Sequence, residues 1–324
     1  MEPIDRRGFL FAAGAATVSL STAAPASPQT RNNGAVFLST WDFGVDANRR
    51  AGEIFAGGGS LLDAVEKGIN LVEDDPNVTS VGYGGLPNAE GEVELDAGIM
   101  DGTTHRAGSV CNLHKIKNPI SVARLVMQKT RHTTMAGDGA LRFAIEMGFA
   151  PQQLLTPKSL EEWLRWRNTP KHETFWIDGR NHDTIGMLGV DGRGGVVAGC
   201  STSGLAWKIP GRVADSPLVG CGYYADVAGA AAATGNGDVM ANYCTSVFIV
   251  RRMAQGAHPQ EACDDLMHLM ARTAPNLREE MYCVIAMSLH GEIGTASMNS
   301  KQPLQYALWR NEAGTLHTAP AFLG

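Results

Sequence analysis

A threonine at position 184 stands where a polar segment meets an apolar one. Residues 169–181 (TPKHETFWIDGRN) are polar, contain a proline and a glycine, and lack a helical period, which predicts an exposed loop. Residues 184–190 (TIGMLGV) are apolar and predict a buried strand. A threonine hydroxyl is a weak nucleophile, but a threonine that begins a chain can use its own α-amine as the base. That amine has an ordinary pKa of about 7.7–8.0, close to working pH.

Thr184 could become the first residue of a chain by cleaving the bond before it. Its hydroxyl would attack the carbonyl carbon of Asp183, the acyl group would move from nitrogen to oxygen, and water would hydrolyse the ester. The sequence DTIG at residues 183–186 also fits an ordinary strand start, so taken alone it is a weak indication.

Further short motifs accompany this site in a fixed order along the chain. Upstream lie residues 39–44 (STWDFG), 72–76 (VEDDP) and 80–85 (SVGYGG); downstream lie residues 201–204 (STSG), 211–217 (GRVADSP) and 233–237 (ATGNG). Together with residues 182–187 (HDTIGM), they resemble the glycosylasparaginases (aspartylglucosaminidases), which belong to the N-terminal-nucleophile hydrolases. The resemblance runs from about residue 35 to the end of the chain.

The resemblance implies roles for the residues that would carry out the reaction. Thr184 would attack the side-chain amide of a glycosylated asparagine, and the Thr234 hydroxyl and Gly235 N–H would donate to the developing oxyanion. Thr202 would form hydrogen bonds near the nucleophile. His182, Asp183 and Thr184 would form the site of self-cleavage.

The resemblance also implies a substrate with free α groups. Arg212 would bind the α-carboxylate of a glycosylated asparagine, and Asp215 would bind its α-ammonium. Trp41 and Ser80 would line or support the pocket. Two alternatives remain open from the residues alone: Arg212 and Asp215 could be a surface ion pair, and Trp41 could be a core aromatic.

The expected fold class is α+β. Strands and helices followed by a second set of strands, helices and strands favour antiparallel sheets with helices packed outside. The resemblance implies a four-layer αββα sandwich of the N-terminal-nucleophile hydrolase type. One domain would then comprise two fragments, residues 27–183 and 184–324, and would pair into a dimer of such heterodimers.

Hydrophobic periodicity and capping signals predict the elements of this fold. Expected helices are residues 47–55, 61–72 (capped by Ser60 with Asp63), one that Pro119 opens, 138–147, one that Ser159 caps with Glu162, 238–254 and 259–273. Expected strands are residues 35–39, 93–95, 108–113, 184–190, 195–199, 282–289, 293–297 and 305–309.

The first 26 residues predict an export signal rather than part of the fold. Arg6 and Arg7 precede a short apolar run, and the sequence APA at residues 24–26 matches the pattern that signal peptidases cut. The paired arginines favour the twin-arginine route and a periplasmic location. An ordinary Sec signal or an uncleaved anchor are the alternatives.

Composition argues against several classes of partner and cofactor. The net charge is −6, so no basic field exists to hold nucleic acid or an anionic membrane surface, and the protein without its signal is not expected to bind either. Neither the histidines nor the six cysteines show metal-ligand spacing, so no metal and no cofactor is expected. The cysteines are expected to be mostly buried thiols.

Two rival functions remain. Plant-type asparaginases with isoaspartyl-peptidase activity share the fold and the threonine nucleophile, but their chains typically place glycine before it, where this chain has Asp183. A catalytically dead periplasmic binding protein would keep the pocket without cleavage. The presence of the residues that cleavage requires argues against this rival.

Overall fold

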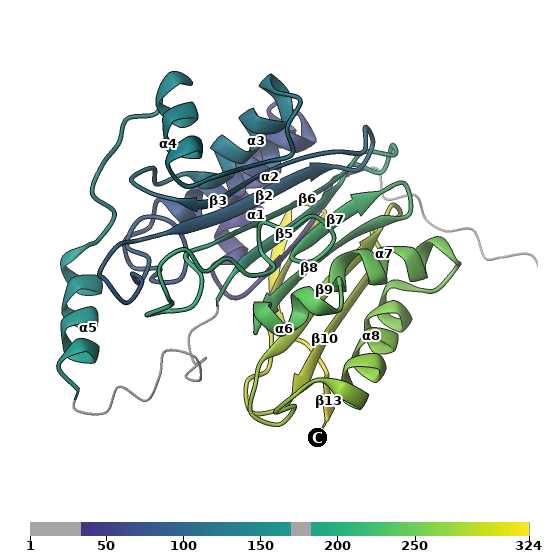
Figure 1. The fold of residues 1–324 in the computed structure, drawn as a ribbon. Coiled ribbons are helices and arrows are strands. Elements are labelled where there is room, and N and C mark those ends of the chain that lie inside the picture. The colour runs from purple at the N-terminus through teal and green to yellow at the C-terminus, as the bar shows by residue number, and fades with distance from the viewer. Residues whose placement is uncertain (1–33, 170–182, 324) are drawn as a thin grey trace, which may run out of the picture. The chain divides into compact units, whose positions relative to one another are not determined.

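Two β-sheets form the centre of the structure (Figure 1). The computed structural model describes residues 34–169 and 183–323. The larger sheet comprises β1 (Val36–Thr40), β2 (Leu95–Asp101), β3 (Arg106–Leu113), β4 (Thr134–Ala136), β5 (Ile185–Val190), β6 (Val196–Thr202), β11 (Gln305–Arg310) and β12 (Ala313–Thr318). The smaller comprises β7 (Tyr223–Asp226), β8 (Gly229–Gly235), β9 (Tyr282–Ser288), β10 (Ile293–Asn299) and β13 (Ala321–Leu323).

Strand order places both predicted fragments in the same sheet. The larger sheet runs β12-β11-β1-β5-β6-β2-β3-β4 and the smaller runs β13-β10-β9-β8-β7. Neighbouring strands are antiparallel except β3 with β4 and β10 with β13. Strand β5, which follows Thr184, pairs with β1 on one side and β6 on the other. Strands from before and after Asp183 therefore share one hydrogen-bonded ladder.

Helices cover the outer faces of the sheets (Figure 1). Helices α1 (Gly44–Ala56), α2 (Leu61–Glu73), α3 (Pro119–Lys129) and α4 (Gly137–Glu146) contact the larger sheet. Helices α7 (Thr245–Ala254) and α8 (Pro259–Thr273) contact the smaller one. The remaining helices are α5 (Pro157–Arg167) and α6 (Gly237–Asn242). These elements confirm the predicted α+β class.

Small residues let the two sheets approach each other closely beside the candidate site. Strand β8 presents buried alanines at residues 230–233, and a Cβ built on Gly186 of β5 would lie 2.8 Å from the Cβ of Ala232. A larger side chain at either position would push the sheets apart. This close contact brings the start of β5 near the end of β8.

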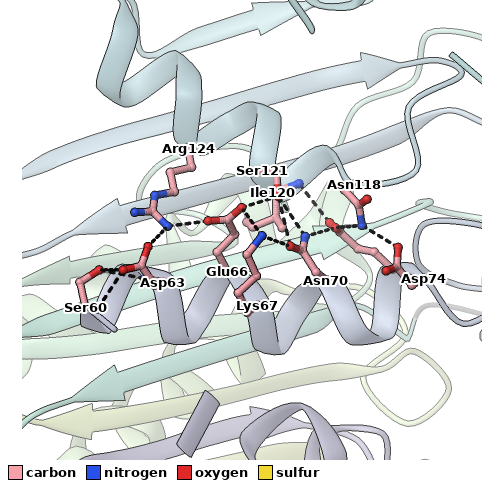
Figure 2. A network of polar contacts seen from close by, with 11 residues as sticks. Ser60, Asp63, Glu66, Lys67, Asn70, Asp74, Asn118, Ile120, Ser121 and Arg124 are labelled. Atoms are coloured by element: carbon pink, nitrogen blue, oxygen red, sulfur yellow. Dashed lines mark hydrogen bonds and ion pairs between the residues drawn. The ribbon is translucent and has the colours of Figure 1, made fainter. Parts of the chain in front are cut away.

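A polar network ties α2 to α3 on the outer face of the larger sheet (Figure 2). Arg124 of α3 pairs with Asp63 and Glu66 of α2 at 2.6 and 2.5 Å. At the end of α2, the Ser201 hydroxyl of β6 donates to Glu73 Oε1 at 2.7 Å. Burial raises the pKa of Glu73 to about 7. The network thus fixes the strand that carries Thr202.

Several predicted elements are confirmed. Helix α2 begins after Ser60, whose hydroxyl accepts from the Asp63 N–H while the Asp63 carboxylate accepts from the Ser60 N–H, as the capping box predicts. Helix α8 spans the predicted residues 259–273, with Pro259 in its first turn. Strand β5 confirms the buried strand after Thr184.

Other predictions are wrong in their bounds. The expected single helix 238–254 is two helices, α6 and α7, because Cys244 between them adopts a φ of 47° that no α-helix tolerates. Helix α5 is capped by Thr156, whose hydroxyl accepts from the Ser159 N–H, so Ser159 lies inside the first turn rather than at the cap. The strand expected at 93–95 begins at Leu95 and continues to Asp101.

Part of the sequence prediction falls outside the described residues. These include the proposed signal at residues 1–26 and all but the first residue of the loop 169–181. Among the helices described, none is both long and apolar enough to cross a membrane.

Candidate active site

Thr184 lies immediately before β5 and is 6% exposed. Its carbonyl oxygen accepts a hydrogen bond of 2.6 Å from the hydroxyl of Thr40, at the end of β1. The Thr40 oxygen in turn accepts the Gly186 N–H at 2.9 Å. One buried threonine therefore fixes the backbone on both sides of Ile185, and with it the position of the candidate nucleophile.

Thr234, near the end of β8, lies next to Thr184. The Thr184 N–H donates to Thr234 Oγ1 at 3.3 Å, and the indole N–H of Trp41 donates to the same oxygen at 3.3 Å. Trp41 is partly buried and packs against the core, and among the described residues neither Trp41 nor Thr234 belongs to the pocket lining. In the uncleaved chain the Thr184 nitrogen is a peptide amide, which cannot act as a base.

Gly235 has a backbone that requires glycine. Its φ is +124°, and a Cβ at this position would lie 2.1 Å from the carbonyl oxygen of Met281. The residue lines the pocket beside Thr184. Any side chain here would displace β8 from β9 and move Thr234 with it.

Thr202 ends β6 and is held by two backbone groups. Its hydroxyl donates to the carbonyl of Ser80 at 3.3 Å and accepts the Gly204 N–H at 2.9 Å. The Ser203 N–H also donates to the Ser80 carbonyl, at 2.7 Å. Ser80 therefore supports the pocket through its main chain.

One pocket brings together five of the predicted residues. Its lining includes Thr184, Thr202, Arg212, Asp215 and Gly235. Thr184 comes from the start of β5, Thr202 from the end of β6 and Gly235 from the end of β8. Arg212 and Asp215 come from the segment between β6 and β7. Residues far apart in sequence thus present hydroxyls and charges to one space.

Asp215 is 4% exposed, which excludes the alternative that it belongs to a surface ion pair. Its Oδ2 is buried and has no hydrogen-bond partner among residues 34–169 and 183–323. Burial raises the pKa of this carboxyl to about 7, against the lowering effect of the Arg212 charge. A buried acceptor without a donor is costly, so this oxygen is suited to receive a ligand's cation.

Arg212 forms an ion pair with Asp238 that was not predicted from the sequence. Its Nε and Nη2 both donate to Oδ2 of Asp238, at 3.2 and 2.6 Å. Asp238 directly follows the motif ATGNG at residues 233–237. A carboxylate adjoining a predicted site motif was therefore the signal that could have identified it.

A buried charge cluster near Arg212 was also not predicted from the sequence. Lys208 is 1% exposed, and its Nζ lies 3.7 Å from carboxylate oxygens of both Glu94 and Asp96. Asp96 lines the pocket. Burial raises the pKa of Asp96, while the charge of Lys208 opposes the rise. The signal was the pair of acidic residues inside an otherwise apolar stretch at residues 93–100.

Comparison with known proteins agrees with this geometry. A family model described as asparaginase matches residues 39–317, which include all five pocket residues predicted from the sequence. The chain belongs to the asparaginase family.

Individual relatives within the asparaginase family cover most of the chain. The protein named N(4)-(β-N-acetylglucosaminyl)-L-asparaginase from Elizabethkingia miricola is 43% identical over 303 residues, covering 90% of this chain and 88% of the relative. Proteins of the same name from Rattus norvegicus and Mus musculus are 38% and 37% identical, covering 78% and 87% of this chain and 82% and 89% of the relatives. These names place the chain among amidohydrolases.

The bond before Thr184 is the one this asparaginase-family chain is predicted to cut. Burial raises the pKa of the Asp183 carboxyl, and the nearby negative charge of Asp42 raises it further. His182 lies outside the described residues. Within the part of the chain that the structure covers, no group of three His, Cys, Asp or Glu side chains could hold a metal ion.

Proposed function

We propose that this asparaginase-family protein is synthesised as one chain, cleaves itself between Asp183 and Thr184, and then hydrolyses the side-chain amide of N4-(β-N-acetylglucosaminyl)-L-asparagine. The single observation that carries the proposal is the pocket that joins Thr184 and Thr202 to Arg212 and Asp215. The names of the relatives support the choice of substrate. No cofactor takes part in the chemistry proposed.

Self-cleavage would come first. The Thr184 hydroxyl attacks the Asp183 carbonyl carbon, and the peptide nitrogen leaves as the acyl group moves to oxygen. Water then hydrolyses the ester, producing a carboxylate on Asp183 and a free α-amine on Thr184. That amine would keep Thr234 Oγ1 as its neighbour, since the amide nitrogen already lies 3.3 Å from this oxygen.

Turnover would use the same hydroxyl a second time. The Thr184 amine accepts the hydroxyl proton, and Oγ attacks the substrate's side-chain amide carbon. The glycosylamine leaves with a proton, and water hydrolyses the acyl-enzyme to release aspartate. The Thr234 hydroxyl and Gly235 N–H would stabilise the oxyanion, and each such donor contributes roughly 2.7–4 kcal/mol.

The charged side of the pocket would select free α groups on the substrate. The partnerless Asp215 Oδ2 would accept the α-ammonium, and the Arg212 guanidinium would bind the α-carboxylate. A peptide bond at either α group would remove one of these charges. The enzyme would therefore act on free glycosylasparagine rather than on intact glycopeptides.

Further proposals concern architecture and location. The two sheets, which contact each other through β5 and β6 with β7 and β8, support a four-layer αββα sandwich that comprises fragments 27–183 and 184–324. Residues 1–26 would direct twin-arginine export to the periplasm. Two αβ heterodimers would assemble into a dimer.

A substrate panel tests the proposed function. Purified, processed protein is incubated with N4-(β-N-acetylglucosaminyl)-L-asparagine, L-asparagine and a β-aspartyl dipeptide, and aspartate release is measured. We expect the glycosylated substrate to give the highest kcat/KM by about tenfold or more. Preference for the dipeptide would instead indicate an isoaspartyl peptidase, and an uncut protein that binds without turnover would indicate a binding protein.

A further inference from the structure

The ion pair between Arg212 and Asp238 holds one edge of the Arg212 guanidinium. Nε and Nη2 converge on a single oxygen of Asp238, at 3.2 and 2.6 Å. A guanidinium has five N–H groups, so two of them are engaged here and three remain for other acceptors. The Arg212 side chain is 16% exposed whereas that of Asp238 is 57% exposed, so Asp238 lies on the more solvent-accessible side of the pair.

The adjacent edge of Arg212, which carries Nη1, lies beside Gly204, and both residues line the pocket. A Cβ built on Gly204, a residue that lines the pocket, would lie 3.3 Å from Nη1. A carboxylate in the pocket could therefore bind Nη1 and the second hydrogen of Nη2 while Asp238 keeps Nε and the first. The two carboxylates would occupy different edges of the same cation and would not exclude each other sterically.

The backbone next to Asp238 is fixed by the pocket itself. A Cβ on Gly237 would lie 2.1 Å from Asp215 Oδ1, so only glycine fits there. The Asn236 side chain caps the following turn by accepting the Val239 N–H at 3.2 Å. Asp238 therefore lies in the first turn of α6, next to a glycine whose position is fixed by contact with Asp215.

We propose that Asp238 is a positioning residue for substrate recognition, which orients Arg212 so that its free edge receives the α-carboxylate of the substrate. This rests on the proposed function only in so far as the substrate carries an α-carboxylate. Two effects of the Asp238 charge oppose each other. It repels an incoming carboxylate, but solvent screens an exposed charge. Asp238 orients Arg212 through direct hydrogen bonds to a mostly buried guanidinium. We therefore expect the orienting effect to outweigh the repulsion, so that Asp238 strengthens substrate binding.

The test compares Asp238→Ala and Asp238→Asn with wild type in the processed enzyme. Asp238→Ala removes both acceptor and charge, and we expect KM for glycosylasparagine to rise about tenfold, the loss expected for one charge-assisted hydrogen bond, with kcat little changed. Asp238→Asn keeps a neutral acceptor and should raise KM less. A fall in KM in both variants would show that Asp238 competes with the substrate, and would overturn the proposal.

A matched control exists on α8. Asp265 Oδ2 accepts the Nε–H of Arg252 at 2.7 Å, and Nη2 of Arg252 lies 2.5 Å from the same oxygen. Asp265→Ala removes an equivalent ion pair outside the pocket lining and should leave KM unchanged. Denaturing electrophoresis verifies that every variant has folded and cleaved.

Two further readouts separate positioning from general damage and from failure of the proposed function. A substrate analogue with an α-carboxamide lacks the anion, so Asp238→Ala should not change its kcat/KM; a loss equal to that for the carboxylate would overturn the proposal. Inhibition by L-aspartate requires no particular amide substrate. The inhibition constant of L-aspartate should rise about tenfold in Asp238→Ala even if the preferred substrate is asparagine or a β-aspartyl dipeptide.

Discussion

The two sides of the pocket satisfy their polar groups in different ways. On the hydroxyl side, the hydroxyls of Thr40 and Thr202 each donate one hydrogen bond and accept another, and the Thr234 oxygen accepts two N–H groups. On the charged side, the buried Oδ2 of Asp215 has no partner in the described chain. The protein itself holds the hydroxyls of Thr40 and Thr202 in place, whereas Asp215 Oδ2 has no hydrogen-bond donor in the described chain.

This difference separates the two reactions proposed for Thr184. Self-cleavage needs only the hydroxyl side, since both the nucleophile and the carbonyl it attacks belong to the chain. Turnover also needs the charged side, because a diffusing substrate has to be held and oriented. Variants on the two sides should therefore have different consequences.

Removing the nucleophile should have the largest effect, because it abolishes both reactions. Thr184→Ala lacks the attacking oxygen, so we expect a single uncut chain on denaturing electrophoresis and no detectable hydrolysis of glycosylasparagine. Thr184→Ser keeps the oxygen and serves as the control, which should still cleave. Two fragments from Thr184→Ala would show that another nucleophile or protease makes the cut.

Changes on the charged side should spare cleavage and reduce turnover. Asp215→Ala and Arg212→Ala each remove a charge-assisted interaction with the substrate, which costs about 1.5–3 kcal/mol or roughly 10- to 150-fold in kcat/KM. Electrophoresis should show normal fragments in the same preparations. Loss of cleavage in proportion to loss of turnover would contradict the separation of the two sides.

The KM for the substrate should depend on pH through Asp215, on the charged side of the pocket. Burial raises the pKa of Asp215 to about 7, and only its ionised form can hold the α-ammonium. KM should therefore increase as the pH falls below about 7. The Thr184 amine acts in the chemical step, so its titration should change kcat. Asp215 acts in substrate binding, so its titration should change KM. A KM that stays constant from about pH 8 to pH 5 would rule out an essential Asp215 carboxylate.

The sequence indicated residues that line one pocket, but it did not indicate the contacts among them. Thr184, Arg212 and Asp215 lie in short contiguous motifs, so they could be identified without knowledge of the fold. The pairing of Arg212 with Asp238 spans 26 positions and depends on how the segment before β7 meets the start of α6. The sequence shows that Asp238 adjoins a site motif, but it does not show that Asp238 pairs with Arg212.

Local signals in the sequence also predicted the elements of the fold better than features that depend on tertiary contacts. The capping box at Ser60 is a local signal and predicted α2 well. The hairpin of β7 and β8 was not predicted, because alanines at residues 230–233 favour a helix and become strand only through the close approach of the two sheets. Likewise, the apolar pattern of residues 238–254 gives no sign of the left-handed turn at Cys244.

The intact mass of the purified, full-length protein shows whether the bond between Asp183 and Thr184 is cut. We expect two fragments, the second with a mass equal to residues 184–324 and an N-terminal sequence that begins with Thr184, in a preparation that hydrolyses glycosylasparagine. A single chain that is uncut at Asp183 and has the same activity would contradict this expectation.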